Sequence, residues 1–515
     1  MATDRSSMIA APALSRRAVL AGAAALAMTT RATATAPSSP ITAMSAVDLA
    51  AAIRSRKVSS REVMDACLAQ IERHNPGVNA IVSLVDADAL RAEADILDRE
   101  AAAGRFRGPL HGFPHAVKDL AATRGIRTTY GSPLFRDLVP QDDAIAVARL
   151  RRAGAILIGK TNVPEFGLGS QSYNPVFGVT GNAYDPSLTA GGSSGGAAVA
   201  LAMRMVPLAD GSDFAGSLRN PAGWNNVFGF RPSPGRVPAL SADGFFQQFG
   251  VEGPMARTVR DLGLLLSVQA GYDDRAPLSL TDDPAVFAAP LDRDFKGRRI
   301  GWLGDLGGTL AIEPGVLDTC QAALQGFRDI GMAIEEVAFP MPEPEMWRMW
   351  LTLRHWAIGG RMAAHYRDPA KRALLKPEAI WEIEGSLKLT GQDLSDASAA
   401  RTTLYQAFRK LFERYDFLVL PTAQTFPFAA SLHWPKEIAG RPMDTYHRWM
   451  EVACPATLAG CPAMGVPAGF GGPRRLPIGL QILGPNRHDL AVLQVAHAYE
   501  QASPWIAASP PPSLG

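Results

Sequence analysis

Apolar positions follow two spacings that alternate along most of the chain. A spacing of three and four residues, typical of an amphipathic helix, occurs at residues 144–152, 259–270 and 316–331. Short continuous apolar runs, typical of buried strands, occur at residues 155–158, 299–302, 417–420 and 478–482. Strands separated by helices of this length predict an α/β fold, an α/β/α sandwich in which helices cover a large mixed central sheet.

Two serines in the N-terminal part stand where helices are expected to begin. Ser45 and Ser59 each precede an acidic residue by three positions, Asp48 and Glu62, which is the spacing of a capping box. We expect an amphipathic helix after each serine, the second running to about residue 74. A strand at residues 80–85 and a helix at 87–103 should follow.

Residues 340–400 break the alternation. Their pattern is helical and they carry four tryptophans, Trp347, Trp350, Trp356 and Trp381. We interpret them as helices packed over the functional face of the sheet. No long Ser/Gly/Pro linker and no internal repeat divides the chain after residue 44, so we expect a single domain over residues 45–510.

The N-terminus has the pattern of an export signal. Arg16 and Arg17 precede the small-residue apolar run at 21–28, and Ala32 and Ala34 supply a small-x-small cleavage site. Residues 1–36 are therefore predicted to be a twin-arginine-type signal peptide and leader, with an uncleaved basic tail as the alternative. The protein should be exported to the periplasm or secreted. No later segment has the 18 or more continuous apolar residues of a spanning helix, so no stable membrane insertion is expected.

Composition narrows the class of partner. Of the 515 residues 47% are hydrophobic and 19% charged, as in an ordinary globular protein. The 51 Lys and Arg nearly balance the 49 Asp and Glu, and a net charge of +2 does not favour nucleic acid or an anionic membrane as partner. A small neutral or apolar substrate fits better.

Cysteine spacing gives no metal or redox motif. Cys67 lies at helical spacing with apolar neighbours and is interpreted as core, and no C-x-x-C pair is present. A disulfide between Cys454 and Cys461 stays open, because export would permit it.

Three segments carry the candidate chemistry. Residues 189–197, TAGGSSGGA, place four glycines around Ser193 and Ser194 just before a helix-like run, and such glycine density allows a close backbone approach to a ligand. A second glycine-containing turn, GSDFAGSLRNPA, spans residues 211–222. Upstream, Lys118 stands in a mostly apolar run, where burial of a lysine is costly unless it serves a purpose.

Together these segments resemble the amidase signature family of serine hydrolases. The resemblance covers residues from about 45 to 271, including GPLHG at 108–112 and GKTNVPEF at 159–166, and resumes at 462–469 and 476–484. It is weak between about 280 and 440, where family members differ in substrate. The helical section at 340–400 is accordingly expected to be a variable substrate-binding part.

The resemblance implies a role for each motif residue. Ser217 matches the nucleophile, Ser193 the serine that follows a cis peptide bond, and Lys118 the catalytic lysine, which must be neutral at rest to accept a proton. The backbone N–H groups of Phe214, Ala215, Gly216 and Ser217 match the oxyanion hole. Asp213, Ser194 and Arg219 match positions that brace the loop by hydrogen bonds. The implied reaction is hydrolysis of a carboxamide through an acyl-enzyme on Ser217, with no metal and no cofactor.

One position departs from the family. Where the family usually has glycine, this chain has Ala215, beside the bulky Phe214. If that residue needs a positive φ, alanine would be strained by about 1 kcal/mol or more. We interpret the change as a subgroup trait that shapes the acyl pocket.

The substrate is the most open part of the prediction. Small aryl or alkyl amides are favoured, with carbamates or esters, and peptide C-terminal amides, as alternatives at the same site. A non-catalytic exported binding protein and a transamidosome-type subunit are the rival classes, and family precedent leaves a homodimer open. Candidate pocket residues are Tyr130, Gly167, Phe214, Trp224, Phe245, Phe246, Trp347 and Trp350.

Three other motifs have formal matches in the chain. Residues 192–196 satisfy G-x-S-x-G, which would make Ser194 the nucleophile of an α/β-hydrolase. Residues 154–161 satisfy the P-loop spacing, but their middle residues are typical of a strand. His111 and His115 have the i, i+4 spacing of a metal pair, but Gly112 and Pro114 disfavour a helix there, so loop hydrogen bonding is expected.

Overall fold

The computed structural model describes residues 40–241, 243–246, 249–503 and 505–514. These residues belong to one compact unit. The predicted signal peptide and leader, residues 1–36, lie outside the described residues and stay a prediction.

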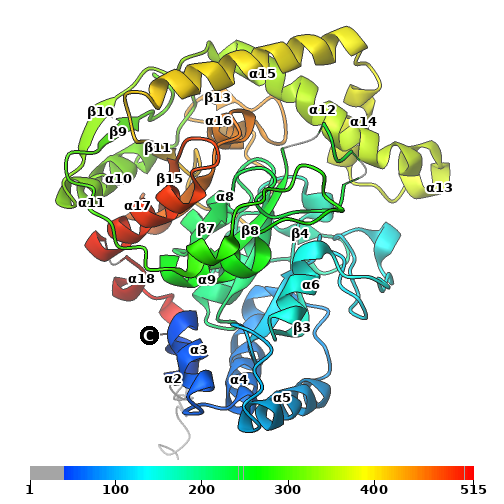
Figure 1. Cartoon of the computed structure of the whole chain (residues 1–515). Coiled ribbons are helices and arrows are strands. Elements are labelled where there is room, and N and C mark those ends of the chain that lie inside the picture. Colours follow the sequence, from blue (N-terminus) through cyan, green and yellow to red (C-terminus); the bar gives the residue numbers. More distant parts are fainter. Residues whose placement is uncertain (1–39, 242, 247–248, 504, 515) are drawn as a thin grey trace, which may run out of the picture. The chain divides into compact units, whose positions relative to one another are not determined.

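Eight strands form the central sheet, in the order β10-β9-β11-β15-β14-β7-β8-β6. β10, β9 and β11 pair in parallel, and the remaining neighbours pair antiparallel. The strands are β6 (Ala209–Asp213), β7 (Phe228–Arg231), β8 (Val251–Ala256), β9 (Arg299–Trp302), β10 (Ala333–Glu336), β11 (Phe417–Pro421), β14 (Ala463–Gly471) and β15 (Leu476–Leu483). Helices lie around this mixed sheet (Figure 1), which confirms the predicted α/β fold class.

A second, three-stranded sheet carries the catalytic lysine candidate. Its order is β1-β3-β2, and β2 runs parallel to β3. β2 also packs against β6 of the central sheet. The strands are β1 (Ile81–Val82), β2 (Pro114–Lys118) and β3 (Ile156–Thr161), and two short hairpins pair β4 (Tyr173–Asn174) with β5 (Gly178–Val179) and β12 (Glu437–Ile438) with β13 (Arg441–Pro442).

Four consecutive helices in the described part of the chain form one block with no strand between them. The block comprises α12 (Glu343–Arg367), α13 (Pro369–Arg372), α14 (Pro377–Ser386) and α15 (Gly391–Leu411), which lie together at the top of Figure 1. The other helices are α2 (Pro40–Ala43), α3 (Ala46–Arg54), α4 (Ser60–Val78), α5 (Ala87–Ala102), α6 (Ile145–Arg152), α7 (Gly195–Ala202), α8 (Arg219–Trp224), α9 (Val259–Gln269), α10 (Val316–Ala323), α11 (Gln325–Asp329), α16 (Cys454–Leu458), α17 (Asp489–Ala502) and α18 (Trp505–Ala508). Residues 340–400 are thus helical, as their pattern predicts.

Local sequence explains where several elements begin. Ser59 forms a full capping box with Glu62 at the start of α4. Ser45 caps α3 by accepting the Asp48 N–H, but its hydroxyl, rather than its backbone N–H, donates to Asp48. The second predicted capping box is therefore only half formed.

Two predicted elements differ in extent. The strand expected at 80–85 is reduced to Ile81–Val82. The helix expected at 316–331 breaks at Leu324, where the backbone switches to the tighter i→i−3 hydrogen bonds Leu324 N–H to Gln321 O and Phe327 N–H to Leu324 O.

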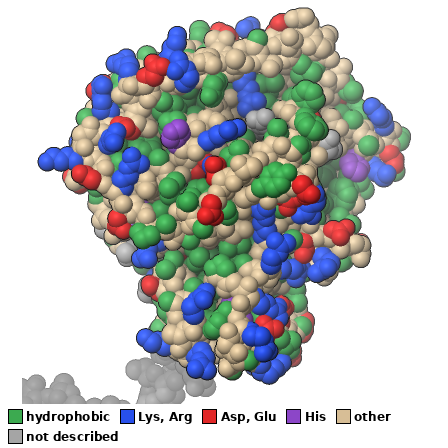
Figure 2. Space-filling view, viewed as in Figure 1, with side chains coloured by type: hydrophobic (Ala, Val, Ile, Leu, Met, Phe, Trp, Pro, Cys, Tyr) green, Lys and Arg blue, Asp and Glu red, His purple; other side chains and the backbone are tan. Residues whose placement is uncertain are grey.

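Several surface and cysteine predictions can be compared with the structure. Cys67, Cys320, Cys454 and Cys461 are all buried and free, so the Cys454–Cys461 disulfide is not formed. Among the described residues no helix is both long and apolar enough to cross a membrane. Basic and acidic side chains intermingle on the face drawn in Figure 2, in keeping with the near-balanced charge.

Candidate active site

Lys118 ends strand β2 and is the centre of a cluster of hydroxyl groups. Its Nζ lies 2.8 Å from Ser193 Oγ, 2.7 Å from Ser194 Oγ and 3.0 Å from Ser212 Oγ, and it donates to the Ser212 carbonyl at 3.1 Å. A hydroxyl can donate or accept, so this shell can satisfy the amine both as an ammonium with three donors and as a neutral group with a lone pair.

Burial changes the proton affinity of this lysine. Lys118 is only 1% exposed, and desolvation lowers its pKa to about 7. The nearby carboxyl groups of Asp210, Asp213 and Glu252 act in the opposite direction and limit the fall. Near neutral pH a large share of Lys118 is therefore neutral and able to accept a proton.

Ser193 and Ser194 are held at the start of α7. The Gly192–Ser193 peptide bond is cis, as the resemblance implies. Every residue of α7 is buried, and a Cβ on Gly196 would come within 2.4 Å of the Asn162 backbone nitrogen and 2.5 Å of the Ala80 carbonyl. Glycine is required there because the start of α7 packs directly on backbone, which places both serines at the end of β2.

Ser217 lies in the loop between β6 and α8, and a buried ion cluster holds that loop. Both carboxylate oxygens of Asp213 accept from Arg219, at 3.0 Å each, and Arg231 Nη1 lies 3.3 Å from Oδ1. Burial by itself raises the pKa of Asp213, but the two guanidinium groups outweigh it and hold the pKa well below its usual range. Asp213 also accepts the N–H groups of Gly216 and Leu218, which flank Ser217.

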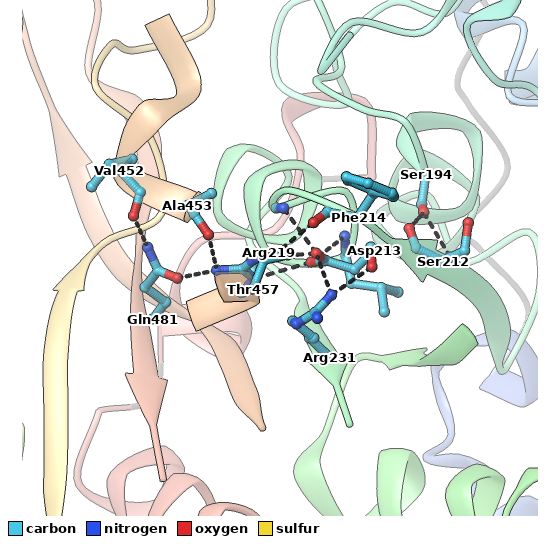
Figure 3. Close-up of polar contacts among 12 residues, drawn as sticks. Ser194, Ser212, Asp213, Phe214, Arg219, Arg231, Val452, Ala453, Thr457 and Gln481 are labelled. Carbon is cyan, nitrogen blue, oxygen red and sulfur yellow. Dashed lines mark hydrogen bonds and ion pairs between the residues drawn. The ribbon is translucent and has the colours of Figure 1, made fainter. Parts of the chain in front are cut away.

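The same cluster connects the loop to residues 452–457 and to Gln481, as Figure 3 shows. Arg219 Nη1 donates to the Ala453 carbonyl and to Gln481 Oε1, and the Gln481 amide donates to the Val452 carbonyl at 2.9 Å. Thr457 Oγ1 donates to the Phe214 carbonyl at 2.7 Å. The loop is thus tied to β15, α16 and the segment before it.

The backbone of this loop resolves the question raised by Ala215. Gly216, not Ala215, has the positive φ, +93°, and a Cβ on Gly216 would lie 2.8 Å from that of Ala453. Alanine at 215 is therefore unstrained, and the strain considered for it does not arise. Of the four N–H groups expected to form the oxyanion hole, that of Gly216 already has Asp213 as acceptor.

Ser193 and Ser217 face the same cavity, of about 890 Å³. Tyr130, Gly167 and Phe214 line it, as predicted for the pocket. One face of α12 forms another part of the wall, through Arg354, Ile358, Arg361, Met362 and His365, which recur at helical spacing. The variable helical section therefore contributes directly to the pocket.

The other predicted pocket residues lie elsewhere. Trp224, Trp347 and Trp350 are at most 5% exposed and do not line the cavity. Trp224 stacks on Trp449, because its large apolar surface is more stably buried in the core. Phe245 and Phe246 are 70% and 73% exposed in a surface turn and are not part of the wall either.

The alternative motif interpretations find little support in the geometry. Gly159 and Lys160 are part of strand β3, and Lys160 is buried against the Ala121 carbonyl and Thr123. The residues with P-loop spacing therefore form a strand and not a phosphate-binding loop. Both ring nitrogens of His111 are occupied by the Arg107 N–H and the Leu97 carbonyl, the expected loop hydrogen bonding. Ser194 bonds Lys118 rather than a histidine.

Several site residues were missed by sequence reasoning. Ser212 contacts Lys118, Asp210 accepts the Lys118 N–H and bonds His115 Nε2, and Glu252 and Arg354 line the cavity. Asp210 and Ser212 lie two residues apart on β6 and therefore share one face of the strand. The segment ADGSD has too little β propensity to be recognised as a strand.

Comparisons with known proteins show which family this chain is similar to. The Amidase family model matches residues 62–493. An acylamidase of Rhodococcus erythropolis is 34% identical over 473 residues, 92% of this chain and 98% of its own, and a glutamyl-tRNA(Gln) amidotransferase subunit of Thermus thermophilus is 35% identical over 483 residues, 89% of this chain and 97% of its own. The crystal structure of a bacterial aryl acylamidase of the amidase signature family superposes with a TM-score of 0.84 at 31% identity, covering 91% of this chain and 98% of that one.

Proposed function

Because this chain belongs to the amidase signature family and is a hydrolase acting on carbon–nitrogen bonds, we propose that it cleaves small aryl or alkyl amides through an acyl-enzyme on Ser217. The observation that carries the proposal is the contact of a buried Lys118 with Ser193, on a cavity that Ser217 also lines. A neutral lysine, a relaying hydroxyl and a second serine are the parts that serine activation requires.

The proposed reaction starts with removal of a proton from Ser217. Ser217 Oγ attacks the amide carbonyl while its proton passes to Ser193, and the proton of Ser193 passes to Nζ of Lys118, which becomes an ammonium. The negative oxygen of the tetrahedral intermediate is stabilised by backbone N–H groups of the Phe214–Ser217 turn, chiefly those not engaged by Asp213.

The leaving amine and water then use the same relay. The C–N bond breaks as Ser193 donates its proton to the amine nitrogen and is reprotonated by Lys118, so the lysine returns to its neutral state. Water next attacks the ester carbonyl of the acyl-enzyme and gives its proton to the relay. Collapse releases the carboxylic acid and returns the proton to Ser217 Oγ.

The cavity supports an apolar acyl or aryl group. Aromatic and aliphatic side chains line it alongside the two serines: Leu120, Tyr130, Phe135, Phe166, Leu168, Phe214, Ile358 and Met362. The similarity to an acylamidase and to an aryl acylamidase supports the same class. A carbamate or ester would present a similar carbonyl to Ser217, so amides, carbamates and esters would be distinguished by their leaving groups.

We expect turnover to rank aryl anilides and small primary amides above the matching carbamates, esters and a C-terminal peptide amide. The ratio of kcat/KM between an anilide and a charged peptide amide should be about tenfold or more, because the aromatic and aliphatic side chains beside the two serines favour an aryl group over a charged one. Release of amine or alcohol from a panel with one common acyl group measures this ranking. A carbamate that outranks every amide would redefine the enzyme as a urethanase.

The pH dependence of kcat/KM should report the protonation state of Lys118. Since the lysine must be neutral and its pKa is about 7, kcat/KM is expected to fall about tenfold per pH unit below that pH and to level off above it. An anilide that does not ionise in the range isolates the enzyme's own titration. A rate that is level from about pH 5 to pH 9 would contradict the role of Lys118 as base.

A further inference from the structure

Glu252 is a carboxyl group on the wall of the catalytic cavity that the proposed reaction does not use. It lies on β8, and its side chain lines the cavity together with Ser193, Ser212 and Ser217. Among the residues that the structure describes, none forms a hydrogen bond or ion pair with its carboxylate. A carboxyl group left without a partner beside a catalytic lysine calls for an explanation.

The strand register determines which way Glu252 points. β6 and β8 pair antiparallel, with Ser212 directly opposite Glu252. Side chains of directly opposed residues lie on the same face of a sheet, with Cβ atoms about 4.5–5.5 Å apart. The Ser212 hydroxyl contacts Lys118 Nζ at 3.0 Å, so the Glu252 side chain is directed toward the lysine as well.

The other carboxylates around Lys118 are already neutralised or occupied. Asp213 is paired with two arginines. Asp210 bonds His115 Nε2 at 2.9 Å and accepts the backbone N–H of Lys118. Glu252 is the third carboxyl group whose charge acts on the lysine, and it differs from the other two because no described residue pairs with it.

We propose that Glu252 is a positioning residue for proton transfer, whose negative charge raises the pH at which Lys118 becomes the neutral base. This inference rests on the proposed function of Lys118. An ionised Glu252 stabilises the ammonium form and delays the appearance of the base as pH rises. This stabilisation is lost when Glu252 is protonated, so the two groups titrate as a coupled pair.

The surroundings of Glu252 are consistent with such coupling. Burial raises the pKa of Glu252 to about 7, Asp210 adds to the rise, and Lys118 opposes it. Both groups therefore change charge in the same pH range. Other titratable side chains on the cavity wall are Tyr130, Asp213, Arg275, Arg354, Arg361, His365 and Arg487.

The test compares Glu252→Gln with the wild type across pH, using two readouts. The first is kcat/KM for an anilide, and the second is the rate at which a fluorophosphonate labels Ser217, which needs no knowledge of the natural substrate. Removing the negative charge disfavours the ammonium, so the acid limb of both profiles should move to lower pH by about 1 unit. Glu313→Gln is the matched control, because Glu313 is also a half-buried carboxyl group with a raised pKa. Its carboxylate accepts the N–H of Phe426, a residue distant from it in sequence.

Different results would contradict the role of Glu252 and the proposed function of the site. Equal acid limbs in wild type and Glu252→Gln, or an equal shift in Glu313→Gln, would overturn the inference. If Glu252→Gln does not fold, Glu252→Asp withdraws the carboxylate by one methylene and should move the limb the same way by a smaller amount; an unmoved limb there overturns the inference too. Absence of labelling in the wild type, or labelling that survives in Ser217→Ala, would instead overturn the proposed function.

Discussion

Ser217→Ala is expected to lower kcat by about 10⁴-fold or more while leaving the fold intact, because in the proposed reaction the covalent intermediate forms on Ser217. The side chain is small and faces the cavity, so its loss creates no unpaired buried charge. Amine release from the best anilide of the panel measures the loss. A stable acyl or phosphonyl adduct on the wild type, absent from the variant by mass spectrometry, would identify the residue directly.

Two further serine variants serve as controls for Ser217→Ala. Ser267→Ala removes a partly buried serine of α9 whose hydroxyl donates to the Leu264 carbonyl within the same helix, and it should keep full turnover. Ser194→Ala removes a partner of Lys118 but not the nucleophile, so an adduct should still form on Ser217. Turnover that survives in Ser217→Ala and disappears in Ser194→Ala would point to Ser194 as the nucleophile.

Asp213→Asn is expected to be the most damaging substitution for stability. Asp213, Arg219 and Arg231 are all fully buried. Nη1 of Arg231 donates to Asp213, whereas its Nε and Nη2 have no hydrogen-bond partner among the described residues. Removing one partner of a buried ion pair typically costs about 3–5 kcal/mol, because the remaining charge is left uncompensated. In the variant, the positive charges of Arg219 and Arg231 would face a neutral amide instead of a carboxylate. The free energy of unfolding from urea titration measures the loss.

A surface carboxylate provides the control for this substitution. Asp95 pairs with Arg61 at 3.0 Å, but the two side chains are 42% and 39% exposed. Asp95→Asn makes the same chemical change where water screens it, and it should cost no more than about 1 kcal/mol. Equal losses in the two variants would show that the cluster around Asp213 does not hold the Ser217 loop through its charge.

Much of the fold and of the site could be predicted from sequence because the signals were local. Ser59 and Glu62 cap a helix by short-range hydrogen bonds, and the apolar runs of β11 and β15 are buried throughout. The serine motifs and the lysine segment were recognisable as a family pattern. In the structure these segments do meet at one cavity.

Other strands escaped prediction because tertiary packing overrides their composition. β6 (ADGSD), β8 (VEGPMA) and β14 (AMGVPAGFG) contain glycine, proline and charged residues that disfavour a strand in isolation. Sheet neighbours on both sides stabilise β8 and β14. Since β6 and β8 carry Asp210, Ser212 and Glu252, the groups that tune Lys118 were missed with them.

By itself, the sequence determined the family and the segments that carry the candidate chemistry, because the residue types of a motif and their neighbours are written in short segments. Only the tertiary structure decided the rest. It put Trp224, Trp347 and Trp350 in the core and one face of α12 on the cavity wall, since burial depends on neighbours distant in the chain. It also lowered the pKa of Lys118 to about 7, because desolvation arises only when β2, β6 and α7 close around the amine.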